Sequence, residues 1–193
     1  SKFIYISTDS VYDGVNGNFS EESIPDPKNY YAKTKLEGEH EVLKCNPNSY
    51  ILRTNIYGYK SPFLSSLFEW AYTSLLENKH ISGYSNVYFN PLYVDQLAEI
   101  IYLIIEHNIP GGIYNIAGSE IISKYEFANK IKKLFNFNAS ISPVEIPGLH
   151  EGVPRPLNTT LNTDKISQYI NMDKYTVTEG LKSIKIKLGN AKN

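Results

Sequence analysis

Strand-like and helix-like segments alternate along the chain. Residues 3–6, 50–53 and 113–116 are short runs of apolar, β-branched and aromatic residues, which are typical of buried strands. Residues 29–44, between the first two runs, are predicted to be helical. A further helical segment has a wide apolar stripe, formed by Val94, Leu97, Ala98, Ile101, Ile104 and Ile105. Because strands that alternate with helices are typical of a parallel sheet, the sequence predicts an α/β fold.

Signals at segment ends predict three more helices. One covers residues 61–78 and has Pro62 near its first turn, where a missing N–H costs least. The other two begin at capping boxes, formed by Ser123 with Glu126 and by Thr176 with Glu179. Residues 80–87 are expected to be irregular or a strand.

Composition narrows the class of protein. The chain has 193 residues, which suits one or two domains, and its net charge of −1 gives no reason to expect a nucleic-acid partner. No apolar run approaches the roughly 18 residues of a membrane span. The single Cys45 excludes an internal disulfide and fits a cytoplasmic location. The four histidines lack metal-ligand spacing, so no metal site is predicted.

Tyr31 and Lys35 form the most informative pair of polar residues. They are four positions apart on a predicted helix, so their side chains share a face. A phenol normally titrates near 10, and a neighbouring cation favours its ionised form. Such a pair can donate a proton during reduction of a carbonyl group. The motif alone is weak, because the chain contains 16 tyrosines; Tyr30 is a competing phenol, but it has Thr34 rather than a cation four residues on.

Hydroxyl and carboxyl groups follow the first predicted strand directly. Ser7, Thr8 and Asp9 come at its carboxyl end, which is where ligands bind in open α/β sheets. We therefore expect Thr8 to lie near Tyr31 and Lys35, as a threonine–tyrosine–lysine constellation.

These segments resemble the extended short-chain dehydrogenase/reductase superfamily, and within it most closely the dTDP-4-dehydrorhamnose reductase family. The resemblance extends in order over residues 7–14, 27–39, 52–58, 93–98, 114–118 and 155–162. It implies part of a Rossmann-like, doubly wound parallel sheet with a smaller C-terminal substrate-binding lobe. The dinucleotide-binding domain would comprise residues 1–60 and 91–118, and the substrate-binding lobe mainly residues 61–90 and 119–193.

The glycine-rich turn with which the family begins does not occur in this sequence. Gly14 and Gly17 form a G-x-x-G, but within a loop rich in turn residues, so we interpret them as a turn. The sequence is therefore expected to be the C-terminal part of a longer protein whose first half binds the pyrophosphate. The alternative is a separate small protein that binds no dinucleotide.

The resemblance implies a reductase that uses NADP or NAD and acts on a nucleotide-linked 4-keto-6-deoxy sugar. Tyr31 would protonate the forming alkoxide, Thr8 would hydrogen-bond the same oxygen, and Lys35 would assist Tyr31 and bind the nicotinamide ribose. The implied cofactor-binding residues are Ser7, Tyr31, Lys35, Thr54 and Asn55. The implied substrate-binding residues are Asp9, Ser10 and Arg155, the last of these at the diphosphate.

At two positions this sequence differs from related enzymes of the superfamily. Dehydratases of the superfamily have a glutamate after Thr-Asp, whereas this chain has Ser10, so dehydration is disfavoured. Between Arg-Thr and Tyr-Gly the reductases have Ser-Trp-Val, whereas this chain has only Asn55-Ile56, so the substrate-facing tryptophan is missing and the segment is one residue shorter. The sugar can therefore differ from dehydrorhamnose. Two alternative functions remain: a sugar-nucleotide epimerase, and a non-catalytic relative like the methionine adenosyltransferase β subunit. The sequence also leaves open whether the protein forms a homodimer.

Overall fold

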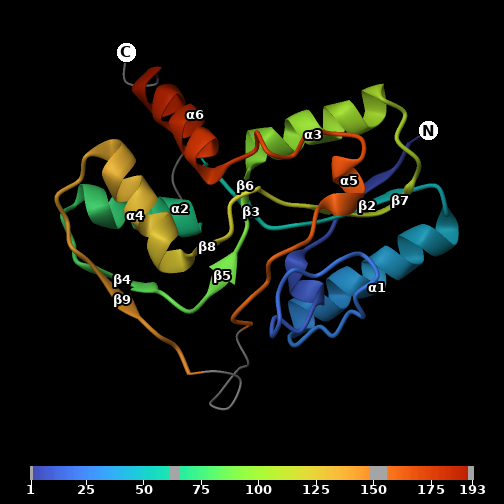
Figure 1. The fold of residues 1–193 in the computed structure, drawn as a ribbon, viewed down its shortest axis with the longest axis horizontal. Helices are drawn as coiled ribbons and strands as arrows, with labels where there is room; N and C mark the ends of the chain where they lie inside the picture. The colour runs from blue at the N-terminus through green and yellow to red at the C-terminus, as the bar shows by residue number, and fades with distance from the viewer. Residues whose placement is uncertain (1, 61–65, 148–155, 191–193) are drawn as a thin grey trace.

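A three-stranded parallel sheet organises one half of the structure. The computed structural model describes residues 2–60, 66–147 and 156–190. The sheet has the order β1-β2-β7, formed by Ile4–Ile6, Tyr50–Thr54 and Gly112–Ile116. Figure 1 shows helix α1 (Tyr30–Cys45) on one side of this sheet and α3 (Val94–Glu106) on the other. The predicted α/β class and parallel pairing are confirmed. We call this part the sheet half.

The core of the sheet half differs in one helix from the prediction. Leu97, Ile100 and Ile104 of α3 are buried in the core that includes the sheet, whereas Val94 and Ile105, at the edges of the predicted stripe, are 42% and 44% exposed. The predicted stripe is wider than the face of α3 that packs on the sheet. Only residues spaced three and four apart along the middle of the stripe reach the core. A later segment returns to this core through Ile166, Ile170, Met172 and Tyr175, and the short helix α5 (Asp164–Ser167) lies against β7.

Helices α2 (Leu67–Leu76), α4 (Lys124–Phe135) and α6 (Val177–Asn190) form the helical half. They pack with a parallel pair of strands, β4 (Ile81–Tyr84) and β9 (Ile141–Val144). The capping box of Ser123 with Glu126 is confirmed, and Thr176 accepts a hydrogen bond from the backbone N–H of Glu179 at the start of α6. The core residues include Phe68, Phe127, Ile131, Leu181 and Ile184.

The predicted start of the helix at residues 61–78 is wrong. The helix α2 begins at Leu67, because Ser66 and Glu69 form a capping box there. Pro62 lies outside the described residues.

Two pairs of two-residue strands lie between the halves. Strand β3 (Ile56–Tyr57) runs parallel to β6 (Leu92–Tyr93), and β5 (Tyr88–Phe89) runs antiparallel to β8 (Ile122–Ser123). The sequence did not predict them individually, because two residues carry no periodicity.

Gly180 provides a test of the packing between α6 and these linking strands. A Cβ atom at Gly180 would overlap the Tyr57 hydroxyl and lie 2.6 Å from the Cβ atom of Tyr93. We expect Gly180→Ala to lower the free energy of unfolding by about 1–3 kcal/mol through overpacking. Gly189→Ala is the matched control, since nothing lies within 4 Å of its Cβ position and alanine favours helix. Urea unfolding of both variants measures the difference, and equal stability would contradict the packing.

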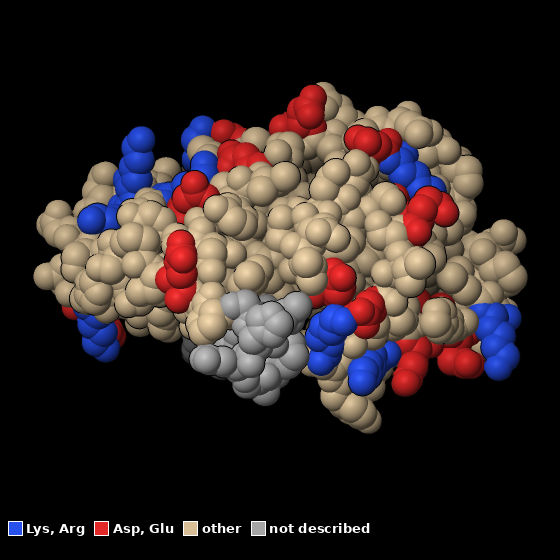
Figure 2. Space-filling view, turned by 60° about the horizontal axis from the view of Figure 1, so that its bottom comes forward, with Lys and Arg blue, Asp and Glu red and all other residues tan. Residues whose placement is uncertain are grey.

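The surface has no strongly charged face in the view of Figure 2, where acidic and basic side chains are interspersed. None of the helices in the described part of the chain combines the length and apolar character of a membrane span. Cys45 is exposed at the end of α1.

Candidate active site

The residues that follow β1 and β2 line a cavity of about 280 Å³ at the carboxyl edge of the sheet. Parallel strands end at the same edge, so the polar residues after β1 meet those at the end of β2. Helix α1 adds Tyr31. The cavity, which we call the strand-end cavity, is lined by Ile6, Ser7, Thr8, Asp9, Ser10, Tyr31, Thr54, Asn55 and Ile56. Seven of these residues were predicted from the sequence to form the site.

Asp9 joins the two strand ends. Its carboxylate is 2% exposed and accepts hydrogen bonds from Thr8 and Ser10, each at 3.2 Å, and from the Asn55 Nδ2 atom at 2.7 Å. Thr8 also caps a 3-10 turn, η1 (Asp9–Val11), by accepting from the Ser10 backbone N–H. Asp9 therefore holds the Thr8 hydroxyl and the Asn55 amide in place beside the cavity.

Tyr31 and Lys35 lie one helical turn apart on α1, whose first turn is capped by Asn29. Tyr31 is 58% exposed, and its hydroxyl has no hydrogen-bond partner within the described ranges. The Lys35 ammonium does not line the cavity; it donates to the carbonyl oxygen of Ile6 at 2.5 Å and lies 4.1 Å from the centre of the Tyr5 ring. Lys35 is therefore fixed to the end of β1, behind the residues that line the cavity.

Thr54 and Ser7 line the cavity in different ways. The Thr54 Oγ1 atom is buried without a partner among the residues the structure describes. The Ser7 hydroxyl instead donates to the buried carboxylate of Glu39, so only the backbone of Ser7 is left for the predicted cofactor contact. Arg155 lies outside the described residues. Among the residues that the structure describes, no group of histidine, cysteine and acidic side chains could hold a metal ion.

A buried ion pair, which the sequence analysis missed, lies beside the ends of β1 and β2. The Arg53 Nη2 atom lies 2.6 Å from the Glu39 Oε2 atom, and both side chains are almost fully buried. Arg53 also donates to the Tyr12 hydroxyl at 2.8 Å. Burial by itself would lower the pKa of Arg53, but the hydrogen bonds and charge of Glu39 outweigh it and raise that pKa. The available signal was the arginine inside an otherwise apolar strand, because a buried charge requires a partner.

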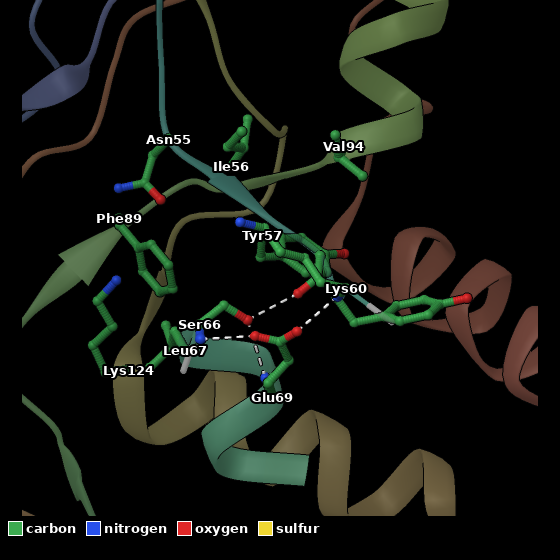
Figure 3. Close-up of a pocket in the computed structure, with 12 residues that line it drawn as sticks. Asn55, Ile56, Tyr57, Lys60, Ser66, Leu67, Glu69, Phe89, Val94 and Lys124 are labelled. Carbon is green, nitrogen blue, oxygen red and sulfur yellow. Dashed lines mark hydrogen bonds between the residues drawn. The ribbon is translucent and has the colours of Figure 1, made fainter. Parts of the chain in front are cut away.

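A second cavity, of about 290 Å³, adjoins the first and shares Asn55 and Ile56 with it. Figure 3 shows that strand β3, the start of α2 and Lys124 of α4 surround it. The Lys124 ammonium lies 3.1 Å from the centre of the Phe89 ring. Burial lowers the pKa of Lys124 to about 8, partly offset by the charge of Asp9. We call this the Lys124 cavity; it extends from the strand ends towards the helical half.

The chain is similar in sequence and in fold to known proteins. The family model described as the RmlD substrate binding domain matches residues 1–188. Methionine adenosyltransferase 2 subunit beta from Xenopus tropicalis is 32% identical over 176 residues, which cover 86% of this chain and 51% of that protein. The chain thus spans about half the length of the curated relatives it matches.

Two solved structures are also similar. A hypothetical dTDP-4-dehydrorhamnose reductase from Sulfolobus tokodaii has a TM-score of 0.79 and 34% identity, over 93% of this chain and 63% of that one. A dTDP-4-dehydrorhamnose reductase from Bacillus anthracis str. Ames, in complex with NADP, has a TM-score of 0.84 and 26% identity, over 97% of this chain and 66% of that one.

Proposed function

The chain belongs to the RmlD substrate binding domain family, and from that premise we propose that it supplies the catalytic residues and substrate-binding lobe of an NADP- or NAD-dependent reductase of nucleotide-linked 4-keto-6-deoxy sugars. The observation that carries the proposal is the meeting of Thr8 and Tyr31 at one cavity, with Lys35 fixed one turn behind. In this proposal residues 1–60 and 91–118 contribute to the dinucleotide-binding domain. Residues 61–90 and 119–193 mainly form the substrate-binding lobe.

The strand-end cavity suits a nicotinamide cofactor. A cofactor there can satisfy the buried Thr54 hydroxyl, which has no partner among the described residues, and can contact the Asn55 side chain and the Ser7 backbone. The B. anthracis reductase, similar in fold, binds NADP. When bound, the cofactor supplies the hydride that reduces the C4 keto carbon.

Tyr31 acts as the general acid in this proposal. Tyr31 lines the cavity, and its hydroxyl bonds to none of the described residues, so in this proposal it donates to the substrate oxygen. Lys35 is held between the Ile6 carbonyl and the Tyr5 ring, one helical turn from Tyr31. In this proposal its charge stabilises the negative charge that develops on the phenol oxygen as the proton leaves.

Thr8 stabilises the same oxygen by a hydrogen bond, for which its single hydroxyl proton turns from the Asp9 carboxylate to the substrate. The Ser10 backbone N–H donates to the Thr8 Oγ1 atom and keeps that atom in place. Asp9 and Ser10 are proposed to contact the sugar, and Arg155 its diphosphate. Ser10 cannot serve as the base that elimination of water requires, which favours reduction over dehydration.

A non-catalytic role is the second candidate, because methionine adenosyltransferase 2 subunit beta is 32% identical over 176 residues. The full-length gene product, mixed with NADPH or NADH and a panel of 4-keto nucleotide sugars, distinguishes the two. The reductase is expected to consume the nicotinamide absorbance with at least one sugar. Cofactor binding without consumption on any sugar would favour the non-catalytic role.

Thr8 offers a specific test of charge stabilisation. We expect Thr8→Val to lower kcat by about 10²–10³-fold, because one donor to the forming oxyanion is lost. Thr8→Ser keeps the hydroxyl and is expected to retain most of the activity. Steady-state kinetics measure both variants, with thermal unfolding as a check on the cap at η1. Equal activity of the two variants would exclude Thr8 as the donor.

A further inference from the structure

Lys124 is a cation in an unfavourable position. It is the first residue of α4, where the partial positive charge of the helix N-terminus disfavours an ammonium group. Its Nζ atom lies over the ring of Phe89, which is 1% exposed. Within the described ranges, Lys124 donates no side-chain hydrogen bond and forms no ion pair; Lys130 of the same helix, in contrast, pairs with Glu120 at 2.9 Å. Lys124 is only partly buried, and among the described residues its ammonium has the Phe89 ring but no hydrogen-bond acceptor or carboxylate as its partner. A cation at a cavity whose hydrogen-bond donors are unused indicates a role in binding.

Two polar residues near Lys124 already have hydrogen-bond partners of their own. Ser66 and Glu69, which also line the Lys124 cavity, are used by the capping box of α2, and Glu69 accepts in addition from the Lys60 backbone N–H at 2.7 Å. In Figure 3 the nitrogen end of Lys124 lies beside Phe89, on the side of the cavity where Asn55 lies. The ammonium therefore lies on the side of the cavity where Asn55 belongs to the lining of both cavities.

The charge of Asp9 raises the pKa of Lys124, but Asp9 accepts no hydrogen bond from the Lys124 ammonium. The Asp9 carboxylate already accepts three hydrogen bonds from neutral groups, and it forms no ion pair with Lys124. Its charge partly opposes the effect of burial, and the pKa of about 8 leaves Lys124 mainly protonated at pH 7. An ammonium can donate up to three hydrogen bonds, and charge-assisted bonds to oxyanions are the stronger kind.

We propose that Lys124 binds an anionic oxygen of the substrate, from the diphosphate or from a carboxylate on the sugar, in the Lys124 cavity. This inference rests on the proposed function in one respect, that the ligand is a nucleotide-linked sugar. It adds a residue from the helical half that selects for charge, and it places the anion on the far side of Asn55 from Tyr31. A 6-deoxy sugar has no carboxylate, so the carboxylate outcome would replace the proposed sugar by a uronic acid.

Calorimetric titration of the full-length gene product tests the proposal, with dTDP, UDP-glucose and UDP-glucuronic acid as probes. Lys124→Met keeps the length of the side chain without its charge, and we expect it to weaken binding by roughly 10–100-fold. Loss for all three probes identifies the diphosphate, whereas loss for UDP-glucuronic acid alone identifies the carboxylate. Lys133→Met, an exposed lysine on the same helix, is the matched control and is expected to bind as the wild type does.

Thermal unfolding separates binding from a structural role. Removal of a poorly placed charge is expected to leave the melting temperature of Lys124→Met equal or higher, whereas a lysine that serves stability would lower it. Lys124→Arg, which keeps the charge, should retain more affinity than Lys124→Met. If the methionine variant does not fold, Lys124→Gln replaces it.

Unchanged affinity of Lys124→Met for every probe would overturn the proposal, as would a wild type that binds none of them. The nicotinamide assay separates this result from the fate of the proposed function. A wild type that binds through Lys124 but reduces no sugar refutes the reductase and keeps the anion site. An active reductase whose Lys124→Met variant keeps wild-type affinity refutes the anion site alone.

Discussion

Replacement of Tyr31 by phenylalanine is expected to lower kcat for reduction of a 4-keto nucleotide sugar by roughly 10²–10⁴-fold, the usual contribution of a positioned general acid. The ring remains and only the hydroxyl is removed. Since Tyr31 is 58% exposed and its hydroxyl bonds to none of the described residues, the variant should fold with the stability of the wild type. Cofactor affinity should change much less than kcat, because other cavity residues remain.

Tyr30→Phe is the matched control for this experiment. Tyr30 is the neighbouring phenol, it is 83% exposed, and it does not line the strand-end cavity. We expect it to keep wild-type kcat. Steady-state kinetics with the full-length gene product, together with a cofactor titration of each variant, give the comparison. If Tyr31→Phe retains activity while Tyr30→Phe loses it, the proton donor has been assigned to the wrong residue.

Much of the sheet half could be predicted from sequence because its signals are local. Alternation of apolar strands with helices gave the parallel pairing of β1, β2 and β7. The position of Thr8 directly after a strand, and the presence of Tyr31 early in the next helix, were enough to bring both to one cavity. Each of these residues lies within, or directly after, the helix or strand that positions it.

Features that depend on distant contacts were not predicted. Arg53 and Glu39 belong to different elements, and only the packing of α1 on the sheet brings them together. Lys124 and Asn55 are likewise joined only by the approach of α4 to the strand ends. The exposed Val94 and Ile105 show the converse, since apolar character alone does not say which side of a helix finds a partner.

The ion pair between Arg53 and Glu39 is expected to have the largest effect on stability. Arg53→Met should lower the free energy of unfolding by about 3–5 kcal/mol, because it leaves a buried carboxylate without its partner. Glu39 is fully buried and Arg53 is 3% exposed, so water cannot replace either partner. Lys174→Met is the control; Lys174 pairs with Glu99 at 2.7 Å on the surface, where a pair contributes about 0–1 kcal/mol.

The double variant Glu39→Leu with Arg53→Met decides whether the pair serves stability or position. In the double variant no buried carboxylate is left without a partner. It should therefore unfold at a higher urea concentration than Arg53→Met alone. The Ser7 hydroxyl and the Tyr12 hydroxyl would still lose the groups that hold them, Glu39 and Arg53. If the pair positions the end of β1, stability therefore recovers in part while kcat stays low. A double variant less stable than either single variant would show instead that the two charges are not coupled in the way their geometry indicates.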